Sequence, residues 1–396
     1  MHITTHSFSF LLLLFITGLL AACDTGLSSD TEITDSDAVD AMFNGRINLN
    51  ELDNYAAQDV PNYVDRDNTE RNSINNVTAT LGRVLFYDTM LSSDQTISCA
   101  SCHKQSNAFG DPAPLSEGVN GTTGRHSMRL INARFADEEN FFWDERAQNL
   151  EAQTTLPIRD HIEMGFSGAQ GAPDFNDLIA RIEAQTYYNE LFSAAFGDPE
   201  VTETRMQNAL AQFVRSIQSF DSKFDIGRAQ VNNNGQDFPN FTALENRGKA
   251  LFLNNTQFQD GTGNRVGGGL GCGSCHRAPT FDITPNSDNN GFIELATGNG
   301  ADLTVTRSPS LRDLFNPAGE LNSPLMHTGS LTTMDQVLDH YNSIQEAGNN
   351  QLDRRLSRGN GNQLNLTAAE REAVIAFLKT LSGTAVYEDA RWSDPF

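Results

Sequence analysis

Apolar side chains recur every three or four residues in several segments of the chain, a period that predicts amphipathic helices. The clearest stripes run through residues 175–182 and 206–217, and a third follows residue 367. Sustained alternation of apolar and polar residues, which would indicate strands, is hard to find. The pattern therefore predicts an all-α protein.

Two of the predicted helices begin with a recognisable start signal. Glu245 follows Thr242 by three residues, and Glu370 follows Thr367 in the same way, which is the spacing of a capping box. Gly- and Asn-rich stretches between the helical segments predict loops. They cover residues 232–240, 260–273 and 286–300.

A coarse repeat divides the chain into two halves. The sequence LGRVLF at 81–86 precedes one cysteine pair, and RGKALF at 247–252 precedes a second pair. Helical segments follow the cysteines in each half, so we expect a duplicated helical unit. With a boundary near 221–225, the predicted domains are 73–222 and 223–396.

The N-terminus has the pattern of an export signal. An apolar run that is too short for a transmembrane helix ends in Leu20-Ala21-Ala22-Cys23, which resembles a bacterial lipobox. It predicts a signal peptide over 1–22, lipidation of Cys23 and a periplasmic lipoprotein that meets the membrane through its lipid anchor only. The choice between the inner and the outer membrane stays open, and an ordinary signal peptide is the alternative. Residues 23–72 are rich in Asp and predict a flexible acidic tether.

The net negative charge of the chain limits which kinds of macromolecule it can bind. The 396 residues carry 27 Lys and Arg against 51 Asp and Glu, a net charge of −24. Such a chain repels phosphate backbones, which excludes nucleic acid as a partner and favours basic proteins.

The remaining cysteines carry the chemistry. They form Cys99-Ala-Ser-Cys102-His103 and Cys272-Gly-Ser-Cys275-His276, two copies of the C-x-x-C-H signature of covalently attached haem c. Two thiols bond the porphyrin, and the following His ligates the iron. Structural disulfides, a Cys₄ zinc site and a thioredoxin-like redox pair are the alternatives.

The motifs around these pentapeptides resemble the bacterial di-haem cytochrome c peroxidase/MauG family over residues 75–383. The first half carries LGRVLFYD at 81–88, LSSD at 91–94, FWDERA at 142–147, LEAQ at 150–153 and EMG at 163–165. The second half carries RSPSLR at 307–312 and MHTGSL at 326–331. The resemblance implies two cytochrome c-like haem domains in tandem.

The resemblance also implies roles for single residues. His103 would be the proximal ligand of a peroxidatic haem and His276 that of an electron-transfer haem. Glu163 matches the distal acid/base and Gln153 the distal amide, while Trp143 matches the aromatic residue between the haems.

Two positions differ from the cytochrome c peroxidases. Where their second haem has an axial Met, this chain has Tyr341, as MauG does. A Met334–Tyr341 core stripe is the alternative interpretation, with Met326 and Met334 as other ligands. Near Gly118, where those peroxidases carry a gating His, no His occurs, so we expect an open first haem.

A calcium ion between the domains is also implied, with Asn322 and Pro324 at ligand positions. His126 stands where the family has a calcium-binding Asn, and imidazole is a poor ligand for a hard cation. His126 capping the iron is the alternative, whereas His161 and His340 are expected to be ordinary polar residues and His327 to lie close behind the second haem.

We therefore predict a peroxidase that reduces hydrogen peroxide at the first haem. A small electron donor, either a cytochrome c or a cupredoxin, would supply electrons through the second haem. The alternatives are oxidative modification of Trp or Tyr on a protein substrate, as in MauG, and a di-haem electron carrier without peroxide chemistry.

Overall fold

The structure is a computed structural model that describes residues 37–259, 261–344, 348–357 and 362–396. The predicted signal peptide and Cys23 lie outside these residues. Helices are the main elements: α1 (Asp37–Phe43), α2 (Asn76–Tyr87), α3 (Cys99–Cys102), α4 (Leu150–Arg159), α5 (Phe175–Glu183), α6 (Thr186–Phe196), α7 (Glu203–Ser216), α8 (Lys223–Arg228), α9 (Ala243–Leu253), α10 (Met334–Asn342), α11 (Ala368–Lys379) and α12 (Ala385–Glu388). Short 3-10 turns are η1 (Thr89–Leu91), η2 (Gln105–Asn107), η3 (Ala133–Phe135), η4 (Cys272–Ser274) and η5 (Ala390–Trp392).

Strands are short and form antiparallel pairs. They are β1 (Glu117–Gly118) with β2 (Gly121–Thr122), β3 (Thr256–Phe258) with β4 (Arg265–Gly268), and β5 (His276–Arg277) with β6 (Asp282–Ile283). The all-α prediction holds in its coarse form, because helices predominate. The loop predicted over 260–273 contains β4, so that part of the prediction is wrong.

Local sequence sets where the predicted helices begin. The hydroxyls of Thr242 and Thr367 accept from the backbone N–H of Glu245 and Glu370, and both Glu side chains return the contact, so both capping boxes are confirmed. The stripe over 175–182 lies in α5, and the stripe over 206–217 lies in α7 except for Ile217, which follows the helix.

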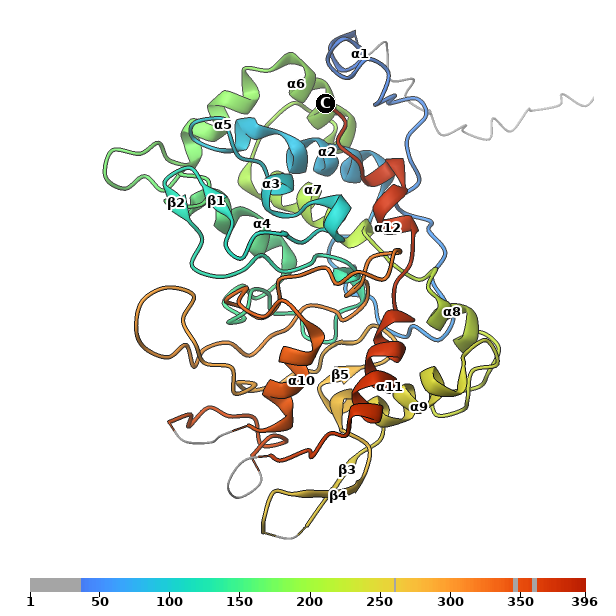
Figure 1. The fold of residues 1–396 in the computed structure, drawn as a ribbon. Coiled ribbons are helices and arrows are strands. Elements are labelled where there is room, and N and C mark those ends of the chain that lie inside the picture. The colour runs from blue at the N-terminus through green and yellow to red at the C-terminus, as the bar shows by residue number, and fades with distance from the viewer. Residues whose placement is uncertain (1–36, 260, 345–347, 358–361) are drawn as a thin grey trace, which may run out of the picture. The chain divides into compact units, whose positions relative to one another are not determined.

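Each half contains one close helix crossing, α2 on α7 and α9 on α11 (Figure 1). A Cβ added to Gly82 would lie 2.0 Å from the carbonyl oxygen of Ala209. One added to Gly248 would lie 1.8 Å from that of Ala373. The glycine shared by the two repeated sequences therefore permits the same close backbone approach in both halves.

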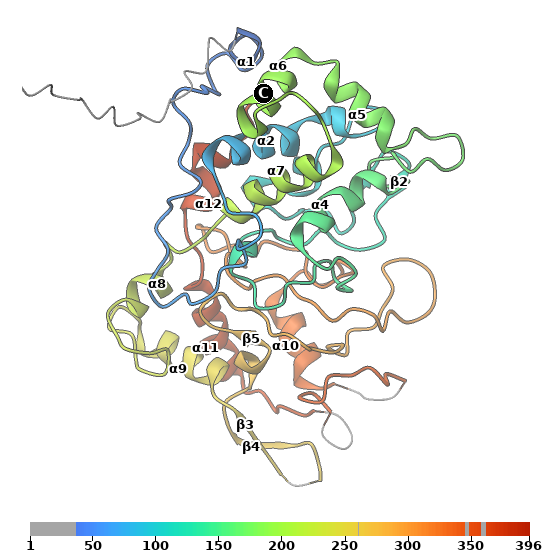
Figure 2. The same ribbon diagram turned by 180° about the vertical axis from the view of Figure 1, so that it is seen from behind.

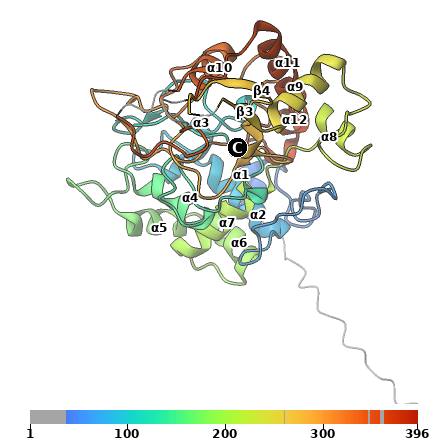
Figure 3. The same ribbon diagram turned by 90° about the horizontal axis from the view of Figure 1, so that it is seen from below.

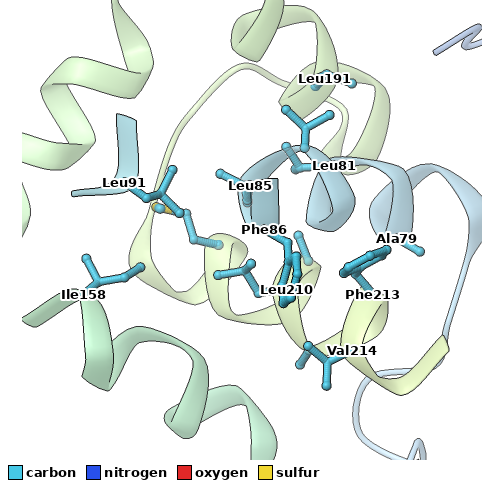
Figure 4. Packing of buried hydrophobic residues seen from close by; sticks show 14 of the residues in the cluster. Ala79, Leu81, Leu85, Phe86, Leu91, Ile158, Leu191, Leu210, Phe213 and Val214 are labelled. Atoms are coloured by element: carbon cyan, nitrogen blue, oxygen red, sulfur yellow. The ribbon is translucent and has the colours of Figure 1, made fainter. Parts of the chain in front are cut away.

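Buried apolar side chains form two clusters. The first core cluster draws on residues from Val39 to Ile217, together with Val386 and Trp392, and the second on residues from Phe224 to Leu381. Figure 4 shows side chains of α2 and α7 meeting in the first core cluster, with Ile158 of α4 beside them. Views from behind and from below show α9 and α11 lying together (Figures 2 and 3). The division into two domains near residue 222 stays a prediction.

The flexible tether predicted over 23–72 is wrong for residues 37–72. Val39, Phe43 and Tyr55 are buried in the first core cluster. The carboxylate of Glu190 accepts from the backbone N–H groups of Ala38 and Val39 and so caps α1. A few well-spaced apolar residues thus anchor a segment whose composition is otherwise that of a linker.

The C-terminal end also departs from the predicted domains, because residues 384–396 pack against the first half. Trp392 is buried in the first core cluster, and its indole N–H donates to Ser216 Oγ at 3.2 Å. The guanidinium of Arg83 donates to the carbonyls of Ala390 and Ser393 at 2.8 and 2.7 Å. Among the described residues, no helix is long and apolar enough to cross a membrane.

Candidate functional site

The first cysteine pair opens into a cavity. Cys99 and Cys102 stand at the two ends of the single turn α3, three residues apart and hence on one face of the helix. Their side chains and His103 line a cavity of about 410 Å³. Burial raises the pKa of Cys99 to about 12, so that its thiol is protonated at neutral pH.

His103 is oriented for a metal. Its Nδ1 lies 3.1 Å from the carbonyl oxygen of Phe109, and a carbonyl can only accept, so Nδ1 carries the proton. Nε2 is then left with a lone pair, which is the usual arrangement of a ligating imidazole. Burial lowers the pKa of His103 and keeps the ring neutral.

The residues assigned to the distal side line the same cavity. Gln153 projects from α4, and Glu163 follows that helix on a tight loop. One carboxylate oxygen of Asp160 accepts from the backbone N–H groups of Ile162 and Glu163, at 2.8 and 3.0 Å, and fixes the loop. Burial raises the pKa of Glu163 to about 7, and the negative charge of Asp160 adds to the rise. A carboxyl with such a pKa can both accept and donate a proton at neutral pH.

Trp143 lies in the same cavity and is held from both halves of the chain. Its indole N–H donates to the carbonyl of His126 at 2.7 Å. Its own carbonyl accepts from the backbone N–H groups of Thr306 and Arg307 at 2.9 and 3.1 Å. Trp143 is 9% exposed, so it is enclosed by other residues on most sides.

The position of the missing gating His has no room for a side chain. A Cβ on Gly118 would lie 2.2 Å from the carbonyl oxygen of Ile162. The backbone N–H of Val119 donates to the carbonyl of Glu163, so the β1–β2 hairpin supports the acid's loop instead. His126, the alternative cap, has its Nδ1 3.1 Å from the carbonyls of Ala113 and Pro114.

The second cysteine pair also lies in a short turn followed by a buried histidine. Cys272 lies in η4, and His276 begins β5, with Nδ1 at 3.4 Å from Ser308 Oγ. Burial lowers the pKa of His276 to about 4, which again leaves a neutral imidazole. Burial raises the pKa of Cys272 to about 12.

Tyr341 lies close to these thiols. Burial raises the pKa of Tyr341 far above its usual value, and a hydrogen bond from Asn290 Nδ2 at 3.1 Å opposes the rise. Cys275 and Cys272 lie near enough to the phenol that ionisation of either thiol would raise this pKa further. The phenol is neutral as it stands, so binding a metal would require loss of its proton. The predicted ligand and its cysteines are thus brought together.

The alternatives to haem fit this geometry poorly. All four described cysteines are free thiols, and among the described residues no group of three or more His, Cys, Asp or Glu side chains could hold a metal ion. Two protonated thiols and a neutral His on one cavity wall do suit a covalently attached porphyrin.

The calcium positions have a different local role in the structure. The amide of Asn322 donates to the carbonyl of Asp313 and to the hydroxyl of Tyr387, both at 2.8 Å. Calcium at Asn322 and Pro324 stays a prediction.

Two residues of the site were missed by the sequence analysis. Asp160, which holds the loop of Glu163, has a local signal, since an Asp followed by two residues of a turn favours this bonding pattern. Arg129 lines the cavity wall, and nothing in its sequence context marks it.

Comparisons with known proteins agree with this donor set. A sequence profile described as "Di-haem cytochrome c peroxidase" matches residues 76–232. The chain is 30% identical to the methylamine utilization protein MauG of Methylorubrum extorquens over 315 residues, 76% of this chain and 77% of that protein. It is 29% identical to the cytochrome c551 peroxidase of Nitrosomonas europaea over 320 residues, 77% of this chain and 80% of that protein.

A solved structure shares the fold. It is a MauG-like protein associated with microbial copper homeostasis, with a TM-score of 0.66 and 27% identity, covering 86% of this chain and 99% of that one. Named cytochrome c peroxidases among the relatives make the chain a peroxidase-type oxidoreductase, and the family implies two haem c groups. The chain belongs to the di-haem cytochrome c peroxidase/MauG family.

Proposed function

We propose that this protein reduces hydrogen peroxide at the haem attached to Cys99 and Cys102. Electrons would come from a small donor protein, a cytochrome c or a cupredoxin, through the haem attached to Cys272 and Cys275. The single observation that carries the proposal is the cavity in which His103, Gln153 and Glu163 meet. When bound, the haem iron supplies the redox chemistry.

Glu163 has the properties of the proton carrier. Reducing one hydrogen peroxide to two waters takes two electrons and two protons, and a proton must move from one peroxide oxygen to the other. An ionised Glu163 accepts the proton from the first oxygen and returns it to the second. Its raised pKa makes both steps feasible at neutral pH.

Gln153 and Trp143 have supporting roles in this proposal. The Gln153 amide lines the cavity with Glu163 and is placed to donate to an oxygen that gains negative charge. Trp143 lies at the contact between the two halves, where a rigid aromatic ring shortens the path for electrons.

The proposal is tested with Glu163→Gln. Loss of a positioned acid/base lowers peroxide turnover by roughly 10²–10⁴-fold. Glu117→Gln is the matched control, because Glu117 lines the same cavity but is exposed, and it should keep nearly full turnover. Equal rates for wild type and Glu163→Gln would remove the assigned role.

A second candidate is oxidative modification of Trp or Tyr on a partner protein. It is favoured by Tyr341, an oxygen donor beside the second cysteine pair in place of a Met. In this case the protein should consume peroxide without a small reductant, and Trp or Tyr side chains of the partner should become oxidised. Mass spectrometry of the partner would detect this change. Turnover that depends wholly on a reduced cytochrome or cupredoxin would favour the first candidate.

Export and anchoring complete the proposal. We infer a periplasmic protein anchored through Cys23. Growth with labelled palmitate tests this inference, because wild type should incorporate the label and Cys23→Ser should not.

Calcium at Asn322 and Pro324 is a separate prediction. Metal analysis of the protein after exhaustive dialysis tests it.

A further inference from the structure

Several arginines line the first cavity, and all but one have an acidic partner. The pairs are Arg125 with Asp144 and Asp302 at 2.7 and 2.8 Å, Arg146 with Asp144 at 2.8 Å, and Arg307 with Asp282 at 3.2 Å. Their charges are neutralised by the protein itself. Arg129, which lines the same cavity, differs from them.

The guanidinium of Arg129 is under-satisfied. Nη2 donates to the carbonyl of Ser310 at 3.1 Å, whereas Nε is shielded from solvent and has no hydrogen-bond partner. Within the described part of the chain, no carboxylate lies within the 4.0 Å of an ion pair. Burial lowers the pKa of Arg129. A desolvated cation without a counter-charge is costly, which points to an anion supplied from outside the chain.

The position of this guanidinium is fixed relative to His103. The stem of Arg129 packs on Gly110, where an added Cβ would lie 2.9 Å from Arg129 Cγ. Gly110 directly follows Phe109, whose carbonyl orients His103. Arg129 therefore lies in the cavity wall and packs against the short segment whose carbonyl orients the proximal histidine.

We propose that the guanidinium of Arg129 binds a carboxylate of the haem attached to Cys99 and Cys102. Haem carries two propionate carboxylates, the cavity is the one in which the haem would sit, and the planar fork of Arg suits a carboxylate. The contact would be made by the Nη atoms, since Nε is shielded from solvent within the cavity wall. The inference rests on the assignment of this cavity to a haem, but not on peroxide reduction.

Asp313 is the competing anion within the protein. Its charge opposes the lowering of the pKa of Arg129, and its own Oδ2 is buried without a partner. The other oxygen of Asp313 accepts from the backbone N–H of Gly383 at 2.9 Å, which holds the carboxylate toward the C-terminal segment. The two groups make no ion pair in the structure.

The test uses the haem-loaded full chain and Arg129→Gln, with each haem followed by spectroelectrochemistry. Loss of a cation beside the haem favours the ferric form. The ferric-to-ferrous ratio of the first haem at a fixed potential should therefore rise about tenfold, which corresponds to a midpoint reduction potential lowered by about 59 mV. The second haem should shift much less. Arg129→Lys, which keeps the charge but not the fork, should lie between wild type and Arg129→Gln.

The matched control is Arg205→Gln, which removes the same charge from an exposed ion pair with Asp198. If Arg129→Gln shifts the first haem no more than Arg205→Gln does, the proposal is overturned. A crystal structure of the haem-loaded wild type decides the matter even if Arg129→Gln fails to fold. A guanidinium nitrogen of Arg129 at hydrogen-bond distance from a haem carboxylate supports the proposal, and Arg129 turned onto Asp313 overturns it.

The pyridine haemochrome spectrum of the wild type separates this inference from the proposed function. A protein with no covalent haem would defeat both. Two haems without peroxide turnover would defeat the proposed function alone and leave the Arg129 test intact.

Discussion

At the scale of single residues, protonation of Glu163 decides when the site can work. The carboxyl must be ionised to accept the first proton, and burial raises its pKa to about 7. We expect kcat/KM for peroxide to rise about tenfold per pH unit below pH 7 and to level off above it. In Glu163→Gln the residual activity should not show this rise of kcat/KM below pH 7. If the rise persists in the variant, a group other than Glu163 causes it.

The same shift affects stability. Because the folded state holds the Glu163 proton more tightly than the unfolded chain, the stabilisation is complete below pH 4.5 and is lost as pH rises to about 7. At 1.36 kcal/mol per pKa unit, the loss is about 3 kcal/mol. Gln cannot ionise, so between pH 4 and pH 8 the free energy of unfolding of Glu163→Gln should fall less than that of wild type. Urea unfolding at both pH values measures this. A difference between the two proteins that does not vary with pH would contradict this.

Tyr341 makes a separate prediction at this scale. If its oxygen is a ligand, Tyr341→Phe should change the absorption and EPR spectra of the second haem and leave the first unchanged. Tyr188→Phe is a suitable control, because Tyr188 is buried in the first core cluster and bonded to Asp88. Unchanged spectra in Tyr341→Phe would mean that Tyr341 is a buried core residue and not a ligand.

The sequence could identify the site only where its signal is local. The two C-x-x-C-H motifs place thiols and histidine within five residues, so their proximity needed no fold. The importance of Arg129 lies in the absence of a counter-charge among the described residues, which depends on segments far apart in sequence. No sequence pattern could therefore indicate that Arg129 is important.

At the scale of elements, the two crossings at Gly82 and Gly248 set the geometry of both halves. Adding a methyl group at either glycine forces it into a backbone carbonyl, so Gly82→Ala and Gly248→Ala should each lower the free energy of unfolding by at least about 2 kcal/mol. Equilibrium urea unfolding measures this. Gly235→Ala, which would meet only the end of the Asn233 side chain, should change it by less than about 0.5 kcal/mol. Near-neutral behaviour of Gly82→Ala would mean that α2 and α7 can separate.

Helix starts were predictable and segment packing was not, for a physical reason. The capping boxes at Thr242 and Thr367 lie within one turn of chain. Residues 37–72 instead contact partners that are distant in sequence, such as Glu190, which caps α1, and Arg83, which pairs with Asp53 at 3.0 Å. Composition alone therefore made that segment resemble a tether.

At the scale of the whole molecule, the net charge of −24 should govern the choice of partner. Many arginines are already engaged in internal ion pairs, as Arg312 is with buried Asp225, so acidic groups remain in excess for a partner. Reduction by a basic cytochrome c should slow at least about tenfold as salt rises from about 10 mM to about 0.5 M. Stopped-flow measurement with an acidic cupredoxin should show the opposite trend, and a salt-independent rate for both would exclude steering.

The packing of Trp392 and Val386 into the first core cluster has a consequence for any fragment of the protein. A fragment that ends before these residues lacks part of the core around the first cysteine pair, so its first half should not reach full stability. Residues far along the chain thus complete the interior of the half that precedes them.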